Sequence, residues 1–173
     1  MNPLPHPTKA GIPMPQLIRV DHISLTVTDL EVSHRFYTGV LDFIQILDFG
    51  YGRIYLHNPS AFILTLIAHP DRTGGRFTEL TTGMDHLGLA AADLDDLRAW
   101  DQRFRELGVE FTPIREAEFG YHLNFRDPDG MALELGVSKD DFAAAMELVK
   151  TGQLSKNQIQ EYARQMLAEL NGE

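Results

Sequence analysis

The sequence predicts an α+β fold built from two copies of a βαβββ module. Two segments carry this prediction because they repeat one pattern, IRVDHISLTVTDL at 18–30 and TGMDHLGLAAADL at 82–94. Each contains Asp-His, then a run of alternating apolar residues typical of a half-buried strand, then Asp-Leu. The aspartate follows the histidine by seven residues in both copies, from His22 to Asp29 and from His86 to Asp93. A repeat of this kind indicates two equivalent structural units.

A helix is expected after each repeated strand. Asp29 and Asp93 stand where a helix N-cap belongs, because a carboxylate there accepts from the free N–H groups of the first turn. In the first copy an apolar stripe extends from Asp29 to about Gly39. In the second copy Gly108 supplies the stop. The apolar helix face before it consists of Leu94, Leu97, Trp100, Phe104 and Leu107.

Three short strand-like runs follow each helix and are separated by turn residues. They cover about 42–49, 52–57 and 61–68 in the first copy, and about 109–115, 120–126 and 131–137 in the second. Asn58-Pro59 and Asp127-Pro128-Asp129-Gly130 mark the turns. We therefore expect a first module at 18–76 and a second module at 77–138.

The two ends of the chain differ in character from the modules. Residues 1–17 are rich in proline and lack the apolar region of a signal peptide, so an extended arm is expected. In residues 139–173 two apolar stripes with helical spacing follow possible capping boxes, Ser138 with Asp141 and Ser155 with Gln158. Two amphipathic helices are predicted, which must bury their stripes on the modules or on a second subunit.

Composition and charge exclude several classes of protein. The formal net charge is -10 and the pI is about 5.1, which opposes binding to nucleic acid or to an anionic membrane surface. No apolar run approaches the roughly 20 residues that span a bilayer, so a cytoplasmic protein is expected. The chain contains no cysteine, so any metal must be held by imidazole and oxygen.

Two histidines and one glutamate are the candidate metal ligands. His22 and His86 open equivalent strands, so pseudo-two-fold packing of the copies would bring them together. Equal steps from the turn before the last strand of each copy reach Glu134 and Thr65. Imidazole and carboxylate suit Fe(II), Mn(II), Zn(II) or Ni(II), and three ligands leave positions open for substrate or water. Non-heme Fe(II) oxygenases use two histidines and one carboxylate, so one divalent ion is predicted, with Fe(II) favoured.

An ordered set of short motifs covers the chain from about Ile18 to Val137. The motifs are Asp21-His22, Thr28-Asp29-Leu30, Phe36-Tyr37, Leu41-Asp42-Phe43, Asp85-His86, Glu106-Leu107-Gly108-Val109, and Phe125-Arg126-Asp127-Pro128-Asp129-Gly130 with Glu134. Together they resemble the vicinal-oxygen-chelate superfamily of glyoxalases, fosfomycin-resistance enzymes, extradiol dioxygenases and bleomycin-binding proteins. The resemblance implies a half-open barrel around the metal, with His22, His86 and Glu134 as ligands. It also shows a departure, because glyoxalase I has an acid where this chain has Thr65.

Four further residues are candidates for catalysis. His122 and Asn124 alternate along the strand that leads into the Asp127 turn, on the face expected to meet the cavity. Extradiol dioxygenases have a tyrosine at the place of Asn124, and Tyr121 lies nearby in the sequence. The resemblance also places His57 near the acid–base histidine of those enzymes.

These observations predict a metal-dependent enzyme whose small-molecule substrate binds the ion through adjacent oxygens. A non-heme Fe(II) dioxygenase is the first hypothesis, and a glyoxalase-like lyase or isomerase, or a transferase, using Mn, Zn or Ni is the second. A binding protein that sequesters a drug or metabolite without turnover is the alternative from another class, and bound stoichiometric metal distinguishes it from an enzyme. A homodimer is expected, because the C-terminal helices offer apolar stripes and the resemblance implies barrels completed by a second chain.

Overall fold

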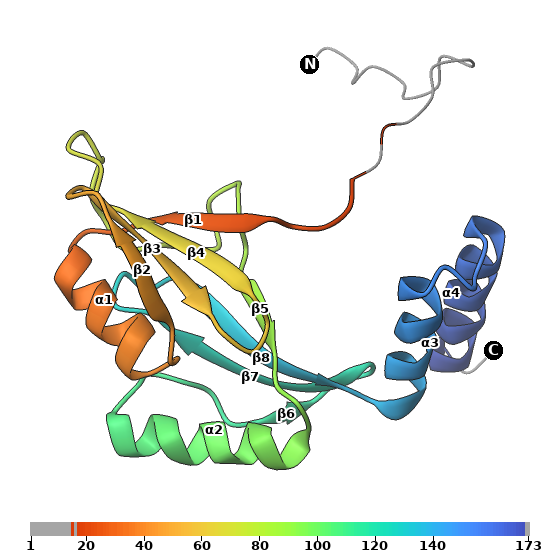
Figure 1. Ribbon diagram of the computed structural model, residues 1–173. Coiled ribbons are helices and arrows are strands. Elements are labelled where there is room, and N and C mark those ends of the chain that lie inside the picture. The colour runs from red at the N-terminus through yellow and green to blue at the C-terminus, as the bar shows by residue number, and fades with distance from the viewer. Residues whose placement is uncertain (1–14, 16, 172–173) are drawn as a thin grey trace.

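The computed structural model describes residues 15 and 17–171, which form two βαβββ modules followed by two helices (Figure 1). The first module contains β1 (His22–Thr26), α1 (Leu30–Gly39), β2 (Ile44–Asp48), β3 (Gly52–His57) and β4 (Phe62–Ile67). The second contains β5 (Leu87–Ala90), α2 (Leu94–Leu107), β6 (Arg115–Glu116), β7 (Gly120–Arg126) and β8 (Ala132–Ser138). The C-terminal helices are α3 (Asp140–Lys150) and α4 (Lys156–Asn171). The predicted arm at 1–17 lies outside the described residues except for positions 15 and 17.

Each module forms one four-stranded sheet, with strand orders β1-β4-β3-β2 and β5-β8-β7-β6. In both sheets the first and last strands of the module pair in parallel, and the other pairs are antiparallel. This shared topology confirms the predicted α+β fold of two βαβββ modules. The strand expected at 109–115 is shorter than predicted, because only β6 and an isolated bridge from Phe111 to Phe125 form. Pro113 lies between them and has no N–H to give to a ladder.

The helices α1 and α2 begin at the predicted caps. The carboxylate of Asp29 accepts from two N–H groups of the first turn of α1, at 2.8 and 3.0 Å. That of Asp93 accepts from the N–H of Asp96 at 2.9 Å. Gly108 ends α2 in the left-handed conformation, with φ 67°, which a residue without a Cβ adopts freely.

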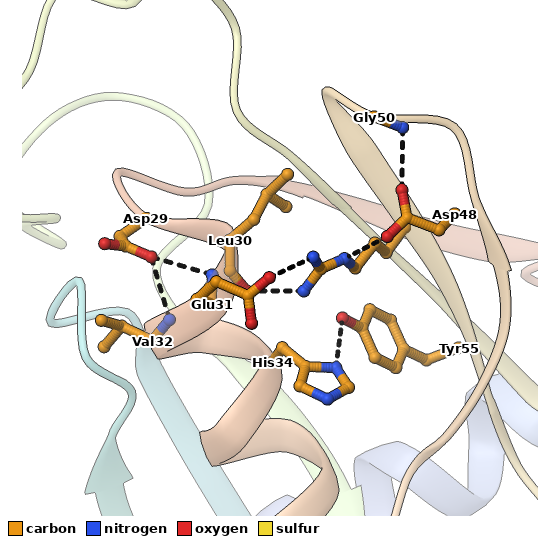
Figure 2. Close-up of polar contacts among 9 residues, drawn as sticks. Asp29, Leu30, Glu31, Val32, His34, Asp48, Gly50 and Tyr55 are labelled. Atoms are coloured by element: carbon orange, nitrogen blue, oxygen red, sulfur yellow. Dashed lines mark hydrogen bonds and ion pairs between the residues drawn. The ribbon is translucent and has the colours of Figure 1, made fainter.

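Ion pairs of Arg53 on β3 connect α1 to the first sheet (Figure 2). Its guanidinium donates to Glu31 in the first turn of α1, and its Nε donates to Asp48 on β2 at 2.7 Å. One turn further along α1, Nδ1 of His34 lies 3.1 Å from the hydroxyl of Tyr55. The Arg53 side chain is only 13% exposed, so the two carboxylates compensate a charge that water hardly reaches. This network orients α1 on the sheet.

One hydrophobic core joins the two modules. One face of each sheet packs with α1 and α2, and the side chains of both modules form a single buried cluster. The turn between β7 and β8 adds polar ties, because Tyr37 donates to Asp127 at 3.0 Å and the N–H of Thr28 donates to Asp129 at 3.0 Å. The largest fully buried side chains are Tyr37, Tyr55, Phe104, Phe125, Leu64, Leu66, Leu97, Leu123, Leu133 and Val27.

The helices α3 and α4 lie beyond the end of β8 (Figure 1), and Phe142 of α3 packs on Phe119 of the second module, with 5.2 Å between ring centroids. The capping box predicted at α4 is present, since Ser155 N–H donates to Gln158 at 2.9 Å and Gln158 N–H donates back at 3.4 Å. The box predicted at Ser138 is not present. Ser138 ends β8, and Lys139 is the N-cap of α3 without a side-chain hydrogen bond. None of the helices in the described part of the chain has the length and apolar character needed to cross a membrane.

Candidate active site

Strand pairing places the candidate ligands on the open faces of the two sheets, which we define as the faces opposite the shared core. On the first sheet, His22 lies two residues before the β1 partner of Thr65, so both side chains share a face. On the second sheet, His86 lies two residues before the β5 partner of Glu134. Thr65 and Glu134 therefore occupy equivalent positions in the two modules.

Each candidate histidine is paired with the aspartate that precedes it. Nδ1 of His22 lies 2.9 Å from Asp21, and Nδ1 of His86 lies 2.7 Å from Asp85. The hydrogen bond from His22 holds the pKa of Asp21 below its ordinary value. A carboxylate at Nδ1 fixes the tautomer and orientation of an imidazole and leaves Nε2 to bind a metal. The repeated Asp-His dipeptide is the sequence signal for this support.

The carboxylate of Glu134 is in hydrogen-bond contact with the imidazole of His122. Nδ1 of His122 lies 2.8 Å from Oε1 of Glu134, and the two side chains are 31% and 20% exposed. Asn124 pairs directly with Glu134 across β7 and β8. Both His122 and Asn124 therefore lie on the open face beside Glu134. Among the residues that the structure describes, Oε2 of Glu134 has no hydrogen-bond partner, which leaves this oxygen for a ligand.

His57 and Tyr121 lie on the core-facing sides of their strands. His57 shares a face of β3 with Tyr55, which is fully buried in the core, and its Nδ1 lies 2.7 Å from Ser60. Tyr121 packs against the core, with the amine of Lys139 over its ring. The side chains of both residues therefore lie on the opposite face of their strands from the open-face residues. Neither faces the candidate metal site.

A cavity of about 460 Å³ lies over the open face of the second sheet, and its lining includes His86 and Glu134. Asn124 also lines it, together with two arginines, Arg115 and Arg126. Four carboxylates and two guanidinium groups surround this space. A divalent cation would therefore balance the formal charge of the lining.

His22 is absent from this cavity. No residue of the first sheet lines it. Within the described part of the chain, no group of three or more His, Cys, Asp or Glu side chains is close enough to hold a metal ion. One chain thus brings His86 and Glu134 together and leaves His22 and Thr65 on a different surface.

Apolar residues accompany His22 and Thr65 on the first sheet. Ile44 and Leu47 of the edge strand β2 lie on its open face and are each 51% exposed. The same strand and the turn after it expose Ile46, Phe49 and Tyr51. Exposed apolar residues that gather on one strand and its turn favour a site of protein or ligand contact.

Two βαβββ modules, each with an Asp-His pair at the start of its first strand, define a protein of the paired-module type. The chain belongs to the glyoxalase/bleomycin resistance protein/dioxygenase superfamily, whose family model matches residues 19–135. This membership confirms the resemblance to the vicinal-oxygen-chelate superfamily. Helices α3 and α4 lie outside the matched residues.

Solved structures have the same fold. A glyoxylase/bleomycin resistance protein/dioxygenase domain from Frankia sp. EAN1pec is 34% identical, with a TM-score of 0.67 over 72% of this chain and 100% of that chain. A mutant of the fosfomycin resistance protein FosX from Listeria monocytogenes, in complex with Mn(II) and 1S,2S-dihydroxypropylphosphonic acid, is 21% identical, with a TM-score of 0.59 over 73% and 95%. Lactoylglutathione lyase from Agrobacterium tumefaciens is 21% identical, with a TM-score of 0.55 over 68% and 92%. Among curated proteins, none has significant sequence similarity to the chain.

Proposed function

We propose that the chain is a metal-dependent enzyme acting on a small molecule that binds the ion through adjacent oxygens, with His22, His86 and Glu134 as protein ligands. The observation that carries this proposal is the equivalence of the two open faces, each with a histidine oriented by its neighbouring aspartate. The donor set suits a divalent transition metal. Family membership supports it as well, since a FosX structure contains Mn(II). Such an ion polarises substrate oxygens and stabilises enolate-like charge.

We infer that the complete site forms between two copies of the chain. His86 and Glu134 would come from one copy, and His22 and Thr65 from the other. The exposed apolar surface of the first sheet, which includes Ile44, supports an interface there. A two-fold symmetric dimer repeats every contact, so it would contain two identical sites.

His122 and Asn124 are the proposed catalytic residues beside the ion. His122 holds Glu134 through Nδ1, which orients the carboxylate, and its ring lies within reach of a substrate bound next to Glu134. An imidazole in this position could act as a general acid or base toward that substrate. The amide of Asn124 would hydrogen-bond a substrate oxygen on the same face.

An Fe(II)-dependent dioxygenase is the first candidate reaction class. Its support is Thr65, which takes the position of a fourth carboxylate and leaves adjacent positions for substrate and O₂. A lyase, isomerase or transferase using Mn(II), Zn(II) or Ni(II) is the second candidate. Its support is the residue at position 124. Extradiol dioxygenases have a tyrosine there, and this chain has Asn124, on the same face as Glu134. A binding protein without turnover is the third.

Co-expression of two variants tests the ligands and their division between chains. His22→Ala and Glu134→Ala chains with different tags should each form homodimers that hold little metal. A mixed dimer would contain one site with both changes and one intact site. Mixed dimers purified through both tags should therefore hold metal in about half of their sites, as two-fold symmetry requires.

Metal-free mixed dimers would contradict a site shared between two copies. A full complement of metal in either single variant would remove that residue from the ligand set. For the wild-type protein, anaerobic purification and elemental analysis identify the ion. Oxygen uptake in the presence of substrate then separates the dioxygenase from the non-redox reactions, and a stoichiometric metal without turnover would favour the binding protein.

A further inference from the structure

Arg126 presents a guanidinium group to the cavity that contains His86 and Glu134. Two of its nitrogens bind one carboxylate of the same chain, with Nη2 at 2.7 Å and Nη1 at 3.1 Å from the oxygens of Glu79. Nη1 also donates to the carbonyl of Gly130 at 3.1 Å, which steadies the arginine from its own turn. Both Arg126 and Glu79 belong to the wall of this cavity.

Glu79 belongs to the irregular segment between the two modules. No helix or strand contains it, since β4 ends at Ile67 and β5 begins at Leu87. Its neighbour Leu80 is 93% exposed, whereas Phe77, two residues before Glu79, packs against the core. The hydrogen bonds from Arg126 lower the pKa of Glu79 to about 2, so the group is an ionised carboxylate at neutral pH. A carboxylate of a ligand can replace this loop carboxylate on the same two nitrogens of the cavity arginine, because both groups offer the same pair of acceptor oxygens.

The spacing between Arg126 and Glu134 sets how far apart two anionic ends of one ligand would lie. Asn124 pairs with Glu134, and Arg126 follows Asn124 by two residues on the same face of β7. Two residues of a strand separate these points by about 7 Å. A second arginine, Arg115, lines the same cavity and forms no ion pair within the described part of the chain. The cavity therefore offers cationic groups at a fixed distance from the candidate metal ligands.

We propose that Arg126 binds a carboxylate of the substrate, and that Glu79 occupies the place of this carboxylate in the free protein. The proposal rests on the proposed metal site and deepens it. The substrate class becomes acids with a chelating pair of oxygens at one end and a carboxylate at the other. Entry of such an acid displaces the Glu79 side chain from Arg126. Arg126 then acts as a specificity-determining residue.

The test measures binding of two probe acids to the Mn(II)-loaded full-length protein by calorimetry. 2-Oxoglutarate and 2-oxobutyrate share the chelating 2-oxo acid group, but only 2-oxoglutarate has a second carboxylate. Wild-type protein should bind 2-oxoglutarate about tenfold or more tightly than 2-oxobutyrate, and Arg126→Gln should remove this preference. Glu79→Gln should raise the affinity for 2-oxoglutarate about two- to fivefold, because it removes a competing ion pair, and leave 2-oxobutyrate unchanged.

Glu116→Gln is the matched control. It makes the same substitution at another exposed ion pair of the second module, with Lys139 at 2.7 Å, away from the cavity. This variant should bind both probes as the wild type does. Equal affinities of wild-type protein for the two acids, with Mn(II) bound, would overturn the substrate class and leave the metal site standing. A lower melting temperature of Glu79→Gln with unchanged 2-oxoglutarate affinity would make the pair a structural tie and also overturn the proposal. Failure of the wild type to bind Mn(II) would instead remove the proposed function, and the substrate class with it.

Discussion

Replacing Tyr37 with phenylalanine removes one hydroxyl from the contact that joins the modules. That hydroxyl donates to Asp127 at 3.0 Å, and the two residues are 1% and 4% exposed. The aromatic packing on Phe43 needs only the ring and is retained. The carboxylate keeps two backbone donors in its own turn, at 2.8 and 2.9 Å, and loses the third. A hydrogen bond to a buried charged group contributes about 1.5–3 kcal/mol, so the free energy of unfolding should fall by this amount.

The size of this loss should depend on pH, because its acceptor titrates. Burial raises the pKa of Asp127 above its ordinary value, and the hydrogen bonds from Met131 and Tyr37 oppose this shift. Folded protein therefore holds the Asp127 proton more tightly than the unfolded chain does. This group contributes stability at low pH, and the contribution is lost as the pH rises through the folded pKa. Tyr37→Phe raises that pKa further, so its cost should be complete at neutral pH and should shrink below the pKa of Asp127.

Urea unfolding at neutral pH and at about pH 4, near the ordinary carboxyl pKa, measures both effects. Tyr55→Phe is the control, because Tyr55 is also fully buried but its hydroxyl contacts the ring of His34 instead of a carboxylate. The control should lose about 0.5–1.5 kcal/mol. If Tyr37→Phe loses no more than the control at neutral pH, or loses as much in acid, then Asp127 is not a buried charged acceptor.

Three other predictions concern the site and its scaffold. Most bound metal should be lost in each of the variants His22→Ala, His86→Ala and Glu134→Ala, while the circular dichroism spectrum stays unchanged. Glu134→Gln should lose less metal, because an amide oxygen still coordinates. Full metal occupancy of one variant in elemental analysis would exclude that residue as a ligand. Thr65→Glu should tighten Zn(II) or Ni(II) and sharply reduce any oxygenase activity, because it adds a fourth ligand and occupies an open position. Metal titration with thermal melting checks this, and destabilisation without tighter binding would show that Thr65 does not reach the ion. Asp93→Ala should lower the free energy of unfolding by about 1 kcal/mol, because it removes the N-cap hydrogen bond of α2. Urea unfolding measures this loss, and an unchanged free energy of unfolding would mean that the cap does not contribute.

Much of the fold could be predicted from the sequence because the repeated motifs act locally. Asp29 and Asp93 both cap helices, since a short carboxylate at that position meets free N–H groups whatever the tertiary context. The predicted strands at 52–57 and 120–126 are those observed. Ser138 shows the limit of such motifs, because it pairs with Gly120 at the end of β8 and Lys139 becomes the N-cap.

The faces of β3 and β7 were harder to predict than their bounds. In β7 the sequence does contain a signal, because Tyr121 is in phase with Leu123 and Phe125, which form the apolar side. In β3 no such signal exists. Both Ile54 and Leu56 are apolar, and so is the ring of Tyr55 between them, so alternation alone does not decide which side His57 joins.

The separation of His22 from His86 depends on information that no local pattern contains. The repeat establishes that the two histidines are equivalent within their modules, but the relation between the modules comes from the complementary shapes of their core faces. Contacts such as Tyr37 to Asp127 bind these faces together across 90 residues of chain. The ion pair between Glu79 and Arg126 is of the same kind, because its partners are 47 residues apart. Long-range packing thus decides which ligands one chain assembles.

Successive side chains of a β-strand point to opposite faces, so the same strands can form both the core and the candidate site. Along β8, Leu133 and Leu135 are buried in the core, and Glu134 between them faces the cavity. A slip of one residue would bury the carboxylate and expose both leucines, so the core that stabilises the module also determines the position of the candidate ligand. Thr65 likewise lies between the buried Leu64 and Leu66 on β4, and it is itself 8% exposed. Apolar truncations on the core face should therefore weaken metal binding only as far as they unfold the module, whereas changes on the open face should alter metal binding at constant stability.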